Sequence, residues 1–168
     1  PAAKPLPENH VLITTHDYSL LHRFSSALAD PGPVVEPLNV RAVSIVGATW
    51  RGSTTEQLVA ARAPLTVAAR AMTSGVRVLP GGPYNALTSS SSLLLTLAND
   101  LPYPLKGVLR VVPRSGILRT EDFVEVDLEA SSRAIPANVP FKGLSNGDVP
   151  IDLWVETADG DRISPTTT

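Results

Sequence analysis

Apolar residues in the second half of this chain recur at every second position, in short runs separated by proline, glycine and aspartate. Residues 93–97 form one such run, a turn-forming segment follows at 99–104, and residues 105–112 are again largely apolar. A period of two is that of a β-strand, whose side chains alternate between the two faces of a sheet. Short strands bounded by turn residues are typical of a β-sandwich, which we expect over residues 84–168.

Three later segments continue this alternation, namely residues 120–129, 135–141 and 149–157. The first places acidic side chains on its outer face, at Glu125, Asp127 and Glu129. Pro136 and Pro140 confine the second segment to a sheet edge or to bulged pairing, because proline has no N–H to donate. Asp159 and Gly160 predict a hairpin turn, and residues 161–164 a final strand after it.

The first half of the chain has a mixed pattern. Residues 11–15 predict a short strand, and Asp17 is a suitable N-cap for a helix over residues 18–29, in which apolar residues have helical spacing. Residues 40–46 fit either a strand or a helix.

A clearer helix signal follows. Residues 53–56 (Ser-Thr-Thr-Glu) have the form of a capping box, which predicts a helix over residues 57–72. Pro64 should kink or split that helix, because its ring clashes with the preceding turn. Residues 76–79 predict a strand.

These patterns together predict an α+β fold. We expect an antiparallel Ig-like β-sandwich over residues 84–168, with an N-terminal mainly helical (α/β) region, residues 1–83, packed on it. The helical region is either a companion of the sandwich or the end of a larger upstream domain.

Composition excludes several classes of protein. Charged residues make up 18% of the 168 and the net charge is −2, which gives no electrostatic reason to expect nucleic acid as a partner. Cysteine is absent, which excludes disulfides and thiolate chemistry. The chain begins with proline, and its one methionine is Met72. We therefore expect a processed or excised piece, whose signal peptide or anchor would lie outside it.

Several short motifs follow one another between residues 53 and 164. They are Leu-Thr-Ser-Ser at 87–90, Leu-Thr-Leu-Ala-Asn-Asp-Leu at 95–101, Ser-Ser-Arg at 131–133, the Asn-Gly turn within 144–151, and Asp-Gly at 159–160. Their order and spacing resemble an uncharacterised actinobacterial family, whose members are large exported cell-envelope proteins with a conserved domain of unknown function. The pattern is also similar to Ig-like modules that accompany carbohydrate-active enzymes.

This resemblance implies a parent protein with a signal peptide and a C-terminal membrane anchor, although no apolar run here approaches the length of about 20 residues that spans a bilayer. It therefore implies an extracytoplasmic location in the cell envelope. It brings no catalytic residues with it.

Few residues suggest chemistry. His10, His16 and His22 lie near Asp17, which would suit a metal site or an acid–base pair, but their spacing of six does not align them on a helix face, so solvated or capping roles are favoured. The acidic row at 121–129 would suit calcium or acid–base catalysis, but alternation along one strand favours a solvated face. We predict no metal and no cofactor.

Trp154 is the best candidate for a contact residue. Strand parity points its indole outward beside Asp152 and Glu156, where it could stack on a sugar ring or anchor a protein partner. The alternative, which we favour, is that it packs against the helical region. Tyr103 is a second candidate for the same contact surface.

From the residues we therefore expect a non-catalytic structural or protein-interaction module of a membrane-associated envelope protein. The alternative is a carbohydrate-binding module that contacts cell-wall polysaccharide through Trp154 or Tyr103. An enzyme is the least favoured class.

Overall fold

The computed structural model describes residues 5–84 and 90–168. The chain forms two compact units, one of helices (Pro1–Ser26 and Asp30–Met72) and one of strands (Ala27–Ala29 and Thr73–Thr168). The motif expected at 87–90 lies outside the described residues except for Ser90. No helix in the described part of the chain has the length and apolar character needed to cross a membrane.

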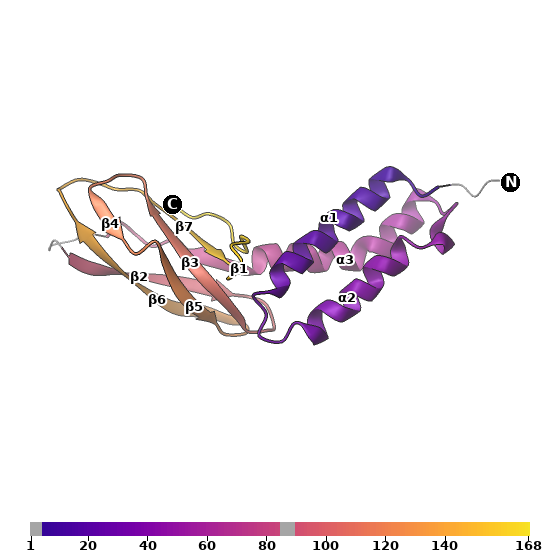
Figure 1. Ribbon diagram of the computed structural model, residues 1–168, viewed down its shortest axis with the longest axis horizontal. Helices are drawn as coiled ribbons and strands as arrows, with labels where there is room; N and C mark the ends of the chain where they lie inside the picture. Colours follow the sequence, from indigo (N-terminus) through magenta and orange to yellow (C-terminus); the bar gives the residue numbers. More distant parts are fainter. Residues whose placement is uncertain (1–4, 85–89) are drawn as a thin grey trace. The chain divides into compact units, whose positions relative to one another are not determined.

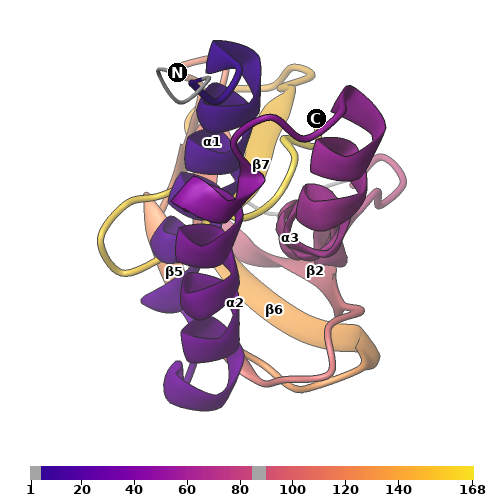
Figure 2. The same cartoon turned by 90° about the vertical axis from the view of Figure 1, so that its right-hand side faces the viewer.

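The helical unit contains α1 (Glu8–Ser25), α2 (Gly32–Ile45), the short 3-10 helix η1 (Ala48–Trp50) and most of α3 (Thr55–Gly75). Figure 2 shows the three long helices. Its core is built from apolar side chains at helical spacing, namely Leu21, Phe24, Val35, Ala42, Ile45, Leu58, Leu65, Ala69 and Met72.

Hydrogen bonds of buried polar side chains join these helices. The Nε2 atom of His10 lies 2.9 Å from the carbonyl oxygen of Ile45, so that α1 is bonded to the end of α2. The hydroxyl of Thr66 on α3 donates to the buried carboxylate of Asp17 on α1, at 2.5 Å.

The first part of this unit differs from the sequence prediction. Residues 11–15 are not a strand but belong to α1, so Asp17 is not an N-cap and lies buried inside the helix. The helix ends at Ser25, and Leu28 instead forms an isolated bridge with Leu105 in the strand unit. The β-branched residues of 11–15 favour strand only weakly, and packing of a helical face against α2 and α3 outweighs that preference.

The capping box of α3 is real but shifted by one residue. Thr54 N–H donates to the side chain of Gln57 at 2.9 Å, and Gln57 N–H donates to the hydroxyl of Thr54 at 3.3 Å. These reciprocal bonds satisfy two N–H groups at the start of the helix. The helix is not split at Pro64, and it ends at Gly75.

The strand unit is a two-layer β-sandwich (Figure 1). Its strands are β1 (Val76–Leu79), β2 (Ser90–Asn99), β3 (Leu105–Pro113), β4 (Leu118–Thr120), β5 (Phe123–Leu128), β6 (Ser132–Gly143) and β7 (Ile151–Glu156). One sheet has the order β1-β2-β6-β4 and the other β5-β3-β7, with antiparallel pairing throughout. The α+β class and the sandwich are thus confirmed. β1 precedes the expected boundary at residue 84 but pairs with β2.

The predicted alternation is confirmed in β5 and β7. Val126 and Leu128 are buried while Glu125 and Asp127 are exposed. In β6, Pro136 and Pro140 occupy a stretch that pairs with β2 on one side, and β4 covers only Phe141–Gly143 on the other. The prolines therefore lie where a missing N–H interrupts no ladder among the described strands.

The turn at Asp159 and Gly160 is confirmed, but the final strand is not regular. Thr157 N–H donates to the carbonyl of Asp161 at 2.8 Å, and Arg162 forms an isolated bridge with Glu156. Beyond it, Val155 N–H is bound by the hydroxyl of Ser164 at 2.7 Å instead of by a backbone carbonyl. This side-chain substitution interrupts the ladder, which resumes as one bridge between Leu153 and Thr167.

Asn99 fastens the turn between β2 and β3. Its side-chain nitrogen lies within hydrogen-bond distance of three backbone carbonyls, those of Tyr103 (2.9 Å), Leu128 (3.2 Å) and Glu129 (3.1 Å). Its side-chain oxygen accepts the N–H of Leu101 at 3.0 Å. One fully buried amide thus ties the end of β2 to the end of β5.

Candidate functional site

The outer face of the three-stranded sheet carries a row of aromatic and cationic side chains. Arg110 on β3 lies opposite Phe123 of β5 on one side and opposite Trp154 of β7 on the other. We call these three residues the outer-face row. The guanidinium of Arg110 lies 5.8 Å from the centre of the Phe123 ring, within the range of a cation–π contact.

Trp154 is half-buried in this row, and its polar and aromatic groups both have partners. Its indole N–H donates to Oε1 of Glu156 at 2.6 Å. The guanidinium of Arg162 lies over the ring, 4.6 Å from its centre. One face of the indole is therefore occupied by a cation from the segment that follows the Asp159-Gly160 turn.

Glu156 accepts hydrogen bonds from two members of the row, Trp154 and Arg110. Its Oε2 accepts the Nε–H of Arg110 at 2.7 Å. Burial raises the pKa of Glu156, but the hydrogen bonds from Trp154 and Arg110, with the nearby charges of Arg110 and Arg162, outweigh burial, and the net effect is a lowered pKa.

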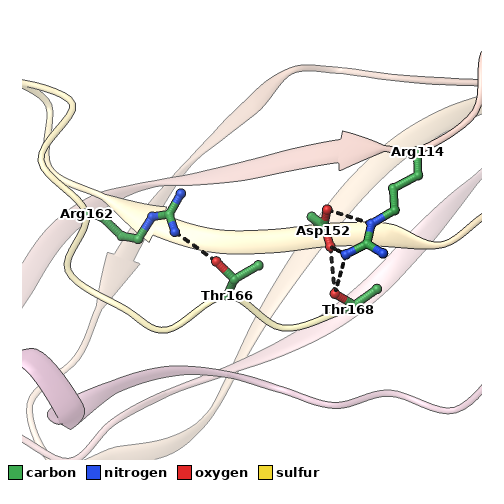
Figure 3. Close-up of polar contacts among 5 residues, drawn as sticks. All are labelled: Arg114, Asp152, Arg162, Thr166 and Thr168. Carbon is green, nitrogen blue, oxygen red and sulfur yellow. Dashed lines mark hydrogen bonds and ion pairs between the residues drawn. The ribbon is translucent and has the colours of Figure 1, made fainter.

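Asp152 forms a second ion pair on the same strand. Nε and Nη2 of Arg114 donate to its two carboxylate oxygens, each at 2.8 Å, and the hydroxyl of Thr168 donates at 2.6 Å. Figure 3 shows these contacts beside the bond from Arg162 to the hydroxyl of Thr166. Hydrogen bonding from Arg114 lowers the pKa of Asp152.

Three of the four residues singled out from the sequence share this face. Asp152, Trp154 and Glu156 all project from β7 on its outer side. Tyr103 lies in the turn before β3, and Arg110 is five residues into that strand from Leu105, which is about 17 Å along it. Tyr103 is therefore not part of the outer-face row.

Sequence reasoning missed the partners of these residues. These partners come from neighbouring segments, and which of them meets a given β7 side chain depends on the register between strands. They are Phe123, Arg110, Arg114 and Arg162. A weak signal was present, since Arg110 on β3 and Arg114, the residue just after the strand, share one parity in the sequence.

The other candidates have separate locations. His10 is buried in the helical unit, on the carbonyl of Ile45, and Asp17 accepts the bond from Thr66. Glu125 and Asp127 are exposed on β5. Among the described residues, no three histidine, cysteine or acidic side chains are grouped so that they could hold a metal ion.

A concave feature lies elsewhere in the sandwich. A cleft of about 960 Å³ is lined by the segment 80–84, by strands of both sheets and by the loop around Gly147. Trp154 and Glu156 do not line it. The outer-face row is thus separate from this cleft.

The fold and this face define an α+β protein whose sandwich presents an ordered aromatic–arginine surface. Residues 14–168 match a family of unknown function (DUF6049), and the chain belongs to that family. The expectation of an uncharacterised domain family is confirmed to this extent. No curated protein matches the chain.

The ion pair of Glu156 predicts a pH-dependent stability. Because its pKa is lowered in the folded state, its contribution is present above the unfolded pKa of about 4.3 and is lost as the pH falls through the folded value. We expect Glu156→Gln to lower the free energy of unfolding by about 1–2 kcal/mol at pH 7, because glutamine keeps an acceptor oxygen but replaces hydrogen bonds to a charged group by neutral ones.

Urea denaturation of both proteins, from neutral pH to about pH 3, measures this difference across the range over which glutamate is protonated. The difference should shrink as the pH falls. The exposed Glu125→Gln is the matched control and should differ little from wild type at any pH. A gap between wild type and Glu156→Gln that stays constant down to the lowest pH would contradict the assignment.

Proposed function

We propose that this chain is a non-catalytic structural or protein-interaction module of an envelope-associated membrane protein, and that it works outside the cytoplasm. Its likeness to exported actinobacterial envelope proteins supports this location. Its membership in a family of unknown function is compatible with the proposal but gives no activity.

The observation that carries the proposal is the outer-face row. Its acidic neighbours each hold an arginine: Glu156 is bonded to Arg110, and Asp152 to Arg114. Carboxylates held in this way order a surface and are poorly suited to transfer protons. Phe123, at the end of the row, is 54% exposed and offers an aromatic anchor of the kind that dominates protein interfaces.

A carbohydrate-binding module is the second candidate. An indole offers a flat apolar face on which a sugar ring could stack, and Trp154 has the hydrogen-bonding carboxylates of Asp152 and Glu156 beside it. The contact of Arg162 with the ring weighs against this candidate, because a sugar that stacks on that face must first displace the guanidinium.

One pair of measurements separates the candidates. A photoreactive amino acid replaces Phe123 in the chain carried by its parent protein, and intact cells are irradiated. In parallel, Trp50→Phe leaves Trp154 as the only tryptophan, and its fluorescence is followed during titration with cell-wall polysaccharide fragments. We expect a defined protein adduct at position 123 and no saturable change in fluorescence.

The same photoreactive group at Leu144, which is also exposed, is the control for chance contact. A saturable fluorescence change with a glycan, and no protein adduct at position 123 above that control, would replace the proposal by the carbohydrate-binding alternative. If neither a protein adduct at position 123 nor a fluorescence change with a glycan is seen, the outer-face row is not a binding surface.

A further inference from the structure

Among the described residues, β5 is the strand whose outer edge is the most open to pairing. β2 extends beyond β1 at its N-terminal end, but there the hydroxyl of Tyr84 donates to the carbonyl of Leu94. β1 and β4 are short, with four and three residues. The free side of β6 carries Pro136 and Pro140, and the edge of β7 is bridged by the segment that contains Arg162 and Thr167. β5 has six residues and no proline, and it pairs only with β3.

Two backbone hydrogen bonds establish which atoms of β5 face outward. Lys106 N–H donates to the carbonyl of Ala27, on the side of β3 away from β5, and Val111 N–H donates to the carbonyl of Asp122, on the β5 side. Because backbone groups alternate along a strand, the odd-numbered residues of β3 are those that bond to β5.

The register then assigns the two sides of β5. The odd-numbered residues of β3 lie opposite Val124, Val126 and Leu128, so these three direct their N–H and C=O groups toward β3. The N–H and C=O groups of Phe123, Glu125 and Asp127 consequently face the open edge. The edge offers three donors and three acceptors in the spacing of an antiparallel or parallel ladder.

The side chains along this edge determine what can pair with it. Residues 121–129 contain five carboxylates and no lysine or arginine. Glu125 and Asp127 are exposed, and their side chains would lie beside those of any added strand. Opposite charges across a strand pair stabilise it and like charges destabilise it, so a second copy of β5 is disfavoured and a basic strand is favoured.

We propose that β5 accepts an extended segment of a partner protein as a further strand of the three-stranded sheet. The segment carries lysine or arginine at alternate positions, beside Glu125 and Asp127, and an apolar residue beside Phe123. This proposal rests on the proposed interaction function and specifies the chemistry of the partner. Backbone pairing provides the contact and the alternate side chains provide the specificity.

Labelled peptides test the proposal with the full chain. One peptide alternates lysine with valine, a second alternates glutamate with valine, and a third is the lysine peptide with the backbone N–H groups of its pairing edge methylated. We expect the lysine peptide alone to bind saturably in fluorescence anisotropy. Binding should slow amide hydrogen exchange at Phe123, Glu125 and Asp127, the residues whose N–H groups face the edge.

Charge reversal supplies the protein variants. Glu125→Lys with Asp127→Lys should weaken the lysine peptide about tenfold or more, because two cross-strand charge pairs change sign, and should allow the glutamate peptide to bind. Glu8→Lys with Glu36→Lys makes the same change of net charge at exposed positions of the helical unit and should leave both affinities unchanged.

Equal binding of the methylated peptide would reduce the effect to attraction between charges and overturn strand addition. Unchanged amide exchange, or no binding by any peptide, would also overturn it. If a protein adduct still forms at position 123 after such a failure, the interaction function stands and only the edge is excluded. If no adduct forms and no peptide binds, both proposals fail.

Discussion

Replacement of Asn99 by alanine is expected to lower the free energy of unfolding by about 3 kcal/mol or more, because each buried polar group left without a partner costs about 1–3 kcal/mol. The side chain of Asn99 is fully buried and serves the N–H of Leu101 and the carbonyls of Leu128 and Glu129, among others. Alanine leaves these groups unpaired where water must enter or the turn must open. Denaturation in urea, followed by near-ultraviolet circular dichroism, measures the loss.

Asn99→Asp separates hydrogen bonding from side-chain volume. It keeps the acceptor for Leu101 N–H but removes the donor and turns a carboxylate toward several carbonyl oxygens, so it should be at least as destabilising as alanine at neutral pH. The exposed Asn146→Ala is the matched control and should change stability little. An Asn99→Ala protein as stable as that control would show that the buried bonds contribute little.

The sandwich was predictable because each of its strands has one buried, apolar face and one more exposed face. In β5 and β7 each buried apolar residue is followed by an exposed or half-buried one, so the period of two is visible without any knowledge of partners. The turn after Asn99 was predictable from the turn-forming residues at 99–104, which is also a local signal. Its contacts with Leu128 and Glu129 were not predictable, because they join segments about 30 residues apart.

The helices were harder to predict because their buried and exposed faces differ little in hydrophobicity. In α2, Ala42 and Ile45 are buried, yet Val40 and Val43 are each 71% exposed, so residues 40–46 are largely apolar all round. Such a segment shows neither the helical nor the strand period. In α1, the buried polar residues His10 and Asp17 interrupt the apolar stripe and made the helix resemble a strand followed by a cap.

The sequence predicted the residues of the candidate site on β7 but not the arginines that contact them. Strand parity placed Trp154, Asp152 and Glu156 on one face, since parity is local. What makes that face ordered is the arginine opposite or above each group, and this depends on the register of β3 with β7 and on the turn at Gly160. Gly160 has a φ of 88°, which glycine adopts without strain, and the segment after it carries Arg162 back over Trp154.

Replacement of Leu65 by alanine is expected to lower the stability of the helical unit by about 3 kcal/mol, through the lost transfer of the side chain and the cavity that remains. Leu65 has no exposed surface and lies in the middle of α3, so every methyl group removed leaves neighbours without contact. Far-ultraviolet circular dichroism during urea denaturation reports this unit, because its helices dominate the signal.

Leu12→Ala, at a leucine of the same unit that is 60% exposed, should change stability by less than about 0.5 kcal/mol. Leu65→Met keeps most of the volume and should cost less than about 1.5 kcal/mol, so a full loss with methionine as well would show that shape, and not burial, governs this position.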